Sequence, residues 1–250
     1  MKVLRFRCEN EIKYGVLEED TIYEITGSVF GDFQLGSKKY YISEVTLLSP
    51  VSPTKVVCVG KNYKEHALEM GEDISEEPVI FLKPPTAVVN PGDAIVYPEM
   101  SKRVDYEGEL VAVIKSVCKN IQPANVPNYI LGYTCGNDVT ARDLQKRDGQ
   151  WTRGKSFDTF CPLGPWIETD VSPECLKLRT YLNGELKQDS STALMITPVF
   201  ELISFVSRIM TLLPGDVVMT GTPAGIGPMD RGDVVEVQIE GIGSLKNYVI

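Results

Sequence analysis

The sequence predicts a strand-dominated α+β protein. Short runs in which apolar and polar residues alternate recur near the N-terminus, in the centre and at the C-terminus, as in Lys2-Val3-Leu4-Arg5-Phe6. This period of two is typical of half-buried strands. Turn-forming segments such as Asn90-Pro91-Gly92-Asp93 separate the runs. Two stretches, residues 62–71 and 198–213, favour helices instead.

Two domains are predicted along the 250 residues. Residues 1–50 form a small N-terminal domain rich in strands, with alternating runs such as Thr21-Ile22-Tyr23-Glu24-Ile25. Pro50 and Pro53 interrupt the chain before the apolar run at 56–60, so we place the boundary there. Residues 51–250 form the larger domain. A chain of this length buries about 70 to 75% of its unfolded surface and needs no disulfides.

The elements of the larger domain follow in order. A strand at 56–60 precedes the helix at 62–71, and the acidic residues 72–78 after it predict a mobile loop. Strand-like runs return at 79–96 and 104–115. The stretch 198–213 predicts one amphipathic helix that packs on the core, because apolar residues recur at helical spacing, namely Phe200, Ile203, Val206 and Ile209, while Glu201, Ser204 and Arg208 face elsewhere.

Composition excludes several classes of function. Lys and Arg number 25 against 34 Asp and Glu, and the formal charge of -9 argues against nucleic acid as a partner. Small acidic substrates remain possible at a locally basic pocket.

The six cysteines form no CxxC pair, which predicts reduced thiols in a cytoplasmic protein. The longest apolar stretch, 194–213, contains Glu201 and Arg208, and the N-terminus lacks an apolar signal core, so we predict no membrane segment.

A pair of carboxylates is the first candidate site. On a strand, Glu107 and Glu109 would point to the same face, where two like charges destabilise the sheet unless a cation neutralises them. Gly108 between them allows another chain segment or a ligand to approach closely. Asp138 follows the apolar run at 129–133 and supplies a third carboxylate. Oxygen ligands favour Mg²⁺ or Mn²⁺. The alternative is a solvated strand face without any metal.

The only histidine, His66, is the second candidate. On a helix, Glu69 lies three residues further along the same face and would orient the imidazole as a general base. Glu65 points away from it. The alternative is a histidine held by hydrogen bonds in the core or on the surface.

Six motifs, in this order, resemble those of the fumarylacetoacetate hydrolase family over residues 50 to 250. They are Val59-Gly60-Lys61-Asn62-Tyr63 with His66 and Glu69, Phe81-Leu82-Lys83-Pro84, Val104 to Leu110, Asn137 to Asp143, Lys155 to Pro162, and Thr220 to Gly227. The resemblance implies a mixed β-sandwich roll, a homodimer, and Mg²⁺ or Mn²⁺ at the active site. It also implies that the helix with His66 belongs to a lid.

The same resemblance implies roles for individual residues. Glu107, Glu109 and Asp138 correspond to the metal ligands, and His66 with Glu69 to the pair that activates water. Lys155 corresponds to a catalytic lysine beside the metal. Substrate contacts are expected from the positions that resemble the family's binding residues, which are Lys61, Arg142, Gln145 and Thr222.

The activity implied is hydrolysis of a C–C bond in a 2-oxo acid such as an acylpyruvate or fumarylpyruvate, through a metal-stabilised enolate. The alternative is an isomerase or decarboxylase of unsaturated 2-oxo dicarboxylates, acting on 2-hydroxyhepta-2,4-diene-1,7-dioate or oxaloacetate. The N-terminal region resembles the domain found in the bacterial dicarboxylate-degrading branch. A non-enzymatic metal-binding module is a third reading, against which the His-Glu pair argues.

Overall fold

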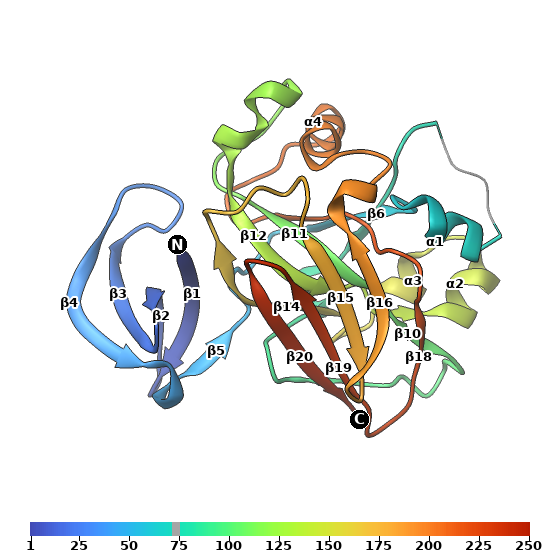
Figure 1. The fold of residues 1–250 in the computed structure, drawn as a ribbon, viewed down its shortest axis with the longest axis horizontal. Helices are drawn as coiled ribbons and strands as arrows, with labels where there is room; N and C mark the ends of the chain where they lie inside the picture. The colour runs from blue at the N-terminus through green and yellow to red at the C-terminus, as the bar shows by residue number, and fades with distance from the viewer. Residues whose placement is uncertain (72–75) are drawn as a thin grey trace.

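The computed structural model describes residues 1–71 and 76–250, and strands dominate it, which confirms the predicted fold class (Figure 1). The predicted acidic loop falls partly on residues 72–75, outside the described residues. No helix in the described ranges has the length and apolar character needed to cross a membrane. All six cysteines are free thiols, as their spacing predicted.

The N-terminal region is an antiparallel meander that stands to one side of the molecule in Figure 1. Its strand order is β4-β3-β2-β1, with β5 added beside β1. β1 also pairs with β14 through Lys2 and Val3, so the meander continues the main sheet rather than standing free of it. Its elements are β1 (Lys2–Cys8), β2 (Glu11–Glu18), β3 (Thr21–Gly27), β4 (Phe33–Tyr41), η1 (Ile42–Glu44) and β5 (Thr46–Leu48).

The main sheet continues from β1 in the order β14-β12-β11-β17-β6-β7. Only the β17–β6 pair within this series is parallel. A short strand, β8 (Val88–Val89), also pairs with β14. The strands of the series are β6 (Val56–Gly60), β7 (Val79–Lys83), β11 (Gly108–Ile114), β12 (Ile130–Asn137), β14 (Cys161–Glu168) and β17 (Val217–Met219).

Two smaller sheets complete the larger domain. One has the order β16-β15-β19-β20-β9 and covers a face of the main sheet; the other has the order β13-β10-β18. Their strands are β9 (Ala94–Ile95), β10 (Val104–Tyr106), β13 (Thr140–Ala141), β15 (Lys177–Leu182), β16 (Glu185–Ser191), β18 (Gly227–Met229), β19 (Val234–Ile239) and β20 (Gly243–Val249). The helices are α1 (Lys64–Glu69), α2 (Arg142–Asp148), α3 (Thr152–Lys155), α4 (Val199–Ile209), η2 (Pro85–Ala87), η3 (Pro123–Tyr129) and η4 (Thr192–Leu194).

The central strand β11 contributes to two hydrophobic cores. Leu110, Ala112 and Ile114 pack into the core that contains α4 and strands of the five-stranded sheet. Val111 and Val113 point the other way and pack with residues of the main sheet and the N-terminal meander. Both faces of β11 are buried, which explains why residues 110–114 are all apolar instead of alternating with polar ones. The strand that carries Glu109 is therefore held from both sides.

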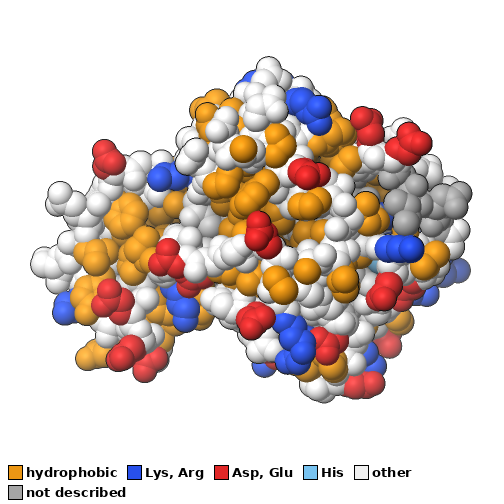
Figure 2. Space-filling view, turned by 45° about the horizontal axis from the view of Figure 1, so that its top comes forward, with side chains coloured by type: hydrophobic (Ala, Val, Ile, Leu, Met, Phe, Trp, Pro, Cys, Tyr) orange, Lys and Arg blue, Asp and Glu red, His pale blue; other side chains and the backbone are white. Residues whose placement is uncertain are grey.

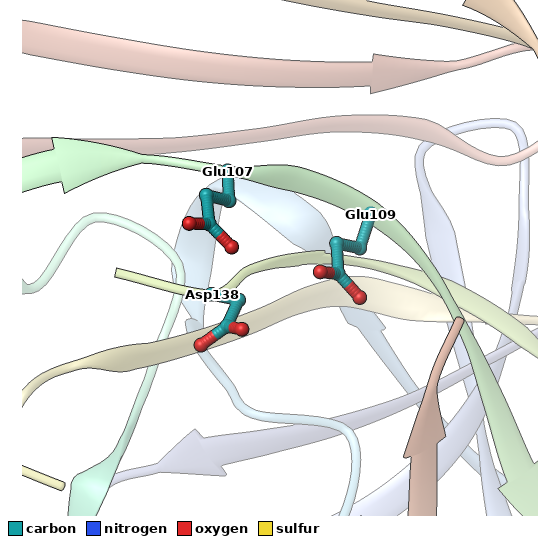
Figure 3. Close-up of side chains that lie close together, drawn as sticks. All are labelled: Glu107, Glu109 and Asp138. Carbon is teal, nitrogen blue, oxygen red and sulfur yellow. The ribbon is translucent and has the colours of Figure 1, made fainter. Parts of the chain in front are cut away.

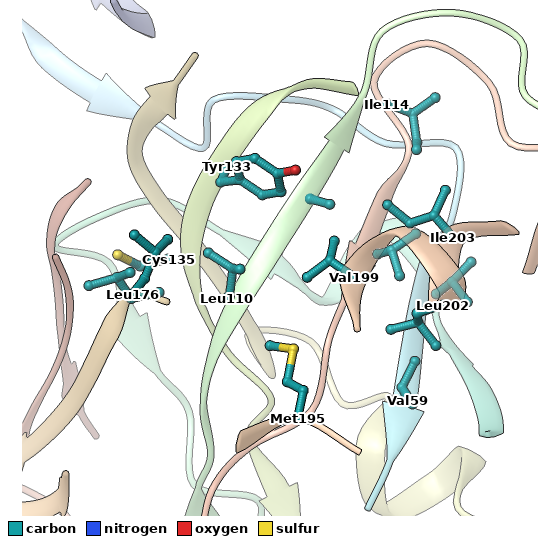
Figure 4. Packing of buried hydrophobic residues seen from close by; sticks show 14 of the residues in the cluster. Val59, Leu110, Ile114, Tyr133, Cys135, Leu176, Met195, Val199, Leu202 and Ile203 are labelled. Atoms are coloured by element: carbon teal, nitrogen blue, oxygen red, sulfur yellow. The ribbon is translucent and has the colours of Figure 1, made fainter. Parts of the chain in front are cut away.

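Helix α4 covers the first of these cores, as Figure 4 shows for its apolar side chains. It is shorter than predicted, because the backbone becomes extended at Met210. The predicted apolar face is partly wrong. Ile203 and Val206 are buried, but Ile209 is 51% exposed and Ser204 is buried. The Ser204 hydroxyl donates to the carbonyl of Ile121, which satisfies it beneath the neighbouring loop.

Charged side chains of both signs are interspersed on the face drawn in Figure 2, with hydrophobic side chains across its centre. This distribution agrees with the acidic composition of the chain.

Candidate active site

The three predicted carboxylates lie together, as Figure 3 shows. Glu109 is on β11, Glu107 occupies the break between β10 and β11, and Asp138 directly follows β12. β11 and β12 pair with Gly108 opposite Asn137, and the Asp138 amide donates to the Glu107 carbonyl at 2.9 Å. This pairing places one oxygen from each carboxylate within 4.8 Å of the others. Glu107 does not lie within a continuous strand, contrary to our prediction.

Burial decides between the two readings of these carboxylates. Glu107 is 4% exposed, and Glu109 and Asp138 are each 1% exposed. Charged groups buried at this level require compensation by cations or hydrogen bonds. The alternative of a solvated strand face is therefore wrong.

Two basic residues compensate part of this charge. The Lys155 ammonium lies 2.8 Å from Glu107 Oε2 and 2.6 Å from Asp138 Oδ2. The Arg142 guanidinium pairs with Glu107 and, at 2.9 Å, with Asp105. Burial opposes ionisation of Glu107, but Lys155 and Arg142 outweigh it and lower the pKa of this carboxyl. Burial likewise opposes the charge on Lys155, yet Asp138 and Glu107 raise its pKa.

The pKa of Glu109 shifts in the opposite direction to that of Glu107. Burial, followed by the charges of Asp138 and Glu107, raises the pKa of its carboxyl well above the usual range. Its Oε2 accepts a hydrogen bond from the Gly221 amide at 2.8 Å. A cation bound among the three groups would remove the repulsion that raises this pKa.

The donor set fits a divalent cation. All three groups offer carboxylate oxygens, which Mg²⁺ and Mn²⁺ prefer. Asp138 Oδ1 is buried and pairs with the Lys83 ammonium, 2.7 Å away. Each carboxylate oxygen has a second lone pair, so this contact leaves the group able to bind a cation as well. Glu107, Glu109 and Asp138 are thus able to hold Mg²⁺ or Mn²⁺.

The predicted His-Glu pair is present on α1. His66 Nδ1 lies 3.2 Å from Glu69 Oε2, and the imidazole is buried, so a freely solvated surface histidine is excluded. Glu69 also accepts from the Gly225 amide at 3.2 and 3.3 Å, which ties the short helix to the loop after β17. His66 lines the same cavity as the acidic triad.

This cavity has a volume of about 320 Å³. Its walls contain all the predicted site residues except Glu69, including the four predicted substrate contacts Lys61, Arg142, Gln145 and Thr222. Their roles stay predictions, because the polar atoms of several are engaged within the protein. Gln145 accepts from Arg142 at 2.7 Å, and the Thr222 hydroxyl donates to the Gly108 carbonyl at 2.9 Å.

Several residues of the site escaped the sequence analysis. Lys146 and Trp151 line the cavity, Asp105 pairs with Arg142, and Lys83 lies beside Asp138. Trp151 packs so closely that a Cβ atom on Gly60 would lie 2.5 Å from its ring. Lys83 did carry a signal, since a lysine at the end of the apolar run 79–82 must find partners if that run is a buried strand.

Comparisons with known proteins agree with this geometry. A family model described as fumarylacetoacetate (FAA) hydrolase C-terminal matches residues 55–250, and one described as Rv2993c-like, N-terminal, matches residues 1–50. The chain belongs to the fumarylacetoacetate hydrolase family. This result confirms the resemblance inferred from the six motifs.

Three relatives with assigned names are informative. Oxaloacetate tautomerase YisK of Bacillus subtilis is 43% identical over 231 residues, covering 86% of this chain and 77% of that protein. The structure of 2-hydroxyhepta-2,4-diene-1,7-dioate isomerase from Mycobacterium marinum has a TM-score of 0.94 at 46% identity, covering 100% of this chain and 98% of its own. That of 5-carboxymethyl-2-hydroxymuconate delta-isomerase from Mycobacterium smegmatis has a TM-score of 0.95 at 44% identity, covering 100% and 99%.

The names of these relatives favour the alternative prediction, an isomerase or decarboxylase, over the hydrolase that the sequence analysis put first. Two of the names are isomerases, and the third, a tautomerase of oxaloacetate, was not predicted. All three names refer to compounds with at least two carboxylates.

Proposed function

We propose that the protein is a divalent-cation-dependent enzyme that moves a proton within a 2-oxo dicarboxylate, as a tautomerase or isomerase does. One observation carries the proposal: a buried acidic triad and His66, whose imidazole pairs with Glu69, line one cavity. The names of the three relatives support the reaction class.

A Mg²⁺ or Mn²⁺ ion held by Glu107, Glu109 and Asp138 would act as a Lewis acid for the negative charge that develops on the keto oxygen of the substrate. The protein's own contribution is proton transfer. Glu69 engages Nδ1 of His66, which leaves Nε2 to take a proton from the carbon beside the keto group and to return it elsewhere.

Basic residues support a dicarboxylate as substrate. Arg142 and Lys155 pair with carboxylates of the acidic triad, and Lys61 and the exposed Lys146 also line the cavity. One carboxylate of the substrate would bind at the metal centre, and the second would be attracted by Lys61 and Lys146. Burial lowers the pKa of Lys61, so an anion beside it would stabilise its charge.

Hydrolysis of an acylpyruvate is the second candidate. The His66–Glu69 pair that would remove a proton from carbon would also activate a water molecule for attack on a distal carbonyl. The two candidates differ in the products that they give. Decarboxylation of oxaloacetate uses the same charge stabilisation and is measured alongside them.

The test is a comparison of four reactions with Mg²⁺, with Mn²⁺ and after chelation. These are ketonisation of enol-oxaloacetate, pyruvate formation from oxaloacetate, cleavage of acetylpyruvate, and isomerisation of 2-hydroxyhepta-2,4-diene-1,7-dioate. We expect metal-dependent proton transfer to be the fastest. His66→Ala should lower its rate by roughly 10²- to 10⁴-fold.

The matched control is Glu65→Gln, because Glu65 neighbours His66 on α1 but is exposed and points away from the cavity. This variant should keep the parent rate. Turnover that survives complete chelation, or cleavage of acetylpyruvate that exceeds both proton-transfer reactions, would contradict the proposal.

We also propose a cytoplasmic homodimer. The six free thiols support a reducing compartment. The hydrophobic side chains at the centre of the face in Figure 2 support contact with a second copy. Sedimentation of the purified protein tests the assembly, and a monomer at micromolar concentration would contradict it.

A further inference from the structure

We propose that Lys83 is a positioning residue of the metal centre, which fixes Asp138 and Lys155 relative to each other. The inference rests on the proposed function in one respect, namely that the acidic triad binds the divalent cation. Lys83 is the last residue of β7 and is only 1% exposed. It lies on the same side of that strand as Phe81, which lines the cavity.

The Lys83 ammonium is enclosed by oxygen atoms. It donates to the backbone carbonyls of Val139 at 3.0 Å, Lys155 at 2.6 Å and Phe160 at 2.8 Å. An ammonium has three protons, and the three carbonyls satisfy them. Asp138 Oδ1 lies 2.7 Å from the same nitrogen, so the ammonium also forms an ion pair with this carboxylate.

The three carbonyls belong to separate segments of the chain. Val139 follows Asp138 at the end of β12, Lys155 ends α3, and Phe160 precedes β14. Lys83 therefore joins the backbone beside one metal ligand to the backbone of the lysine that contacts that ligand. If Lys83 were absent, three buried carbonyls would lose their partner and the segments would separate.

The two lysines have different tasks. The Lys155 ammonium contacts the side chains of Glu107 and Asp138 and the Phe81 ring, whose centroid is 5.0 Å away, and Lys155 lines the cavity. Lys83 does not line the cavity, and besides Asp138 Oδ1 its nitrogen contacts three backbone carbonyls. Lys83 therefore acts through Asp138 and Lys155 and does not touch the substrate.

The direction in which metal affinity changes distinguishes a positioning role of Lys83 from a purely electrostatic one. Removing the positive charge of Lys83 beside Asp138 would reduce repulsion of a bound cation and, taken alone, strengthen its binding. Losing the contacts that Lys83 makes with the backbone would instead weaken binding, because Asp138 would no longer be held in place. Positioning thus predicts a change opposite to the one that the charge predicts.

The experiment is calorimetric titration of the full chain with Mg²⁺ and with Mn²⁺, together with thermal unfolding. In Lys83→Met and in Lys83→Arg, we expect affinity to fall roughly 10- to 100-fold, the usual effect of losing a group that orients a metal ligand. The arginine variant keeps the charge, but its planar guanidinium does not match three carbonyls arranged around one nitrogen.

The matched control is Lys55→Met. Lys55 also pairs with a buried aspartate, Asp216, but neither residue lines the cavity. This variant should unfold at lower temperature and bind metal as the parent does. Lys83→Gln, which keeps two donors, replaces Lys83→Met if the latter does not fold.

Each outcome is informative. Weaker binding in folded Lys83 variants, with unchanged binding in the control, supports the assignment. Unchanged or tighter binding in Lys83→Met overturns it, and failure of every Lys83 variant to fold makes the residue purely structural. If the parent binds neither ion, the metal centre itself is refuted, which is distinguishable from failure of Lys83 alone.

Discussion

Replacement of Gly108 by alanine is expected to disturb both stability and metal binding. Gly108 lies between Glu107 and Glu109, and a Cβ atom there would be 2.1 Å from the Thr180 hydroxyl oxygen. Ordinary contacts between heavy atoms are about 3.5 Å, so Gly108 on β11 and Thr180 on β15 must move apart by about 1.4 Å. Overpacking of this kind costs about 1–3 kcal/mol, and a displacement of about 1 Å at a reaction centre lowers rates by about 10²-fold.

The assay is urea unfolding together with Mg²⁺ calorimetry. Gly31→Ala is the control, since its nearest neighbour, Ser28, is 3.7 Å from the added carbon and the effect should stay below about 0.5 kcal/mol. Thr180→Ala in the Gly108→Ala background should restore most of the loss, with a coupling of about 1–2 kcal/mol. The Thr180 hydroxyl has no hydrogen-bond partner, so its removal breaks none. Parent-like stability and affinity in Gly108→Ala alone would refute the reasoning.

Three further predictions concern charged groups. Burial opposes ionisation of Asp216, but hydrogen bonds from Lys55 and Thr54 lower the pKa of its carboxyl. The ionised carboxylate therefore stabilises the folded state at a pH above the pKa of the unfolded chain, about 4, and this stabilisation is lost as the pH falls toward the lowered pKa. Asp216→Asn should cost about 3 kcal/mol in urea unfolding at pH 7 and flatten the loss of stability in acid; an unchanged acid profile would contradict this. Because the pKa of Glu109 is raised, metal binding should release a proton from this carboxyl, and metal affinity should fall as the pH falls. Calorimetry in buffers of different ionisation enthalpy measures the proton release. A metal affinity that does not change with pH would disprove the prediction. Glu69→Gln should lower kcat with little effect on Mg²⁺ affinity, because Glu69 orients His66 without belonging to the triad; a parent-like kcat would speak against the pair.

The acidic triad was largely predictable, because its signals are local. Glu107 and Glu109 are two residues apart, and Asp138 follows an apolar run whose end could be located. The pair His66 and Glu69 is likewise fixed by the geometry of one helical turn. Spacing left the burial of the carboxylates open, and the structure resolved it.

The supporting residues were not predictable, since their partners are distant in sequence. The structural role of Lys83 depends on its contacts with carbonyls 56 to 77 residues away in the sequence. Helix α4 ends at Ile209, where the backbone becomes extended at Met210, and the apolar periodicity continued past this point without marking it. Ser204 is buried although it is polar, and a carbonyl of another segment, that of Ile121, accepts its hydroxyl proton.

The position of β11 between two cores limits how this enzyme can diversify. A substitution that shifts β11 must be accommodated on both faces at once, by residues around Leu110 and around Val111. Lys61 and Lys146, in contrast, line the cavity without belonging to either core. Changes in what the cavity accepts are therefore expected at such wall positions, while the strand that carries Glu109 stays the same.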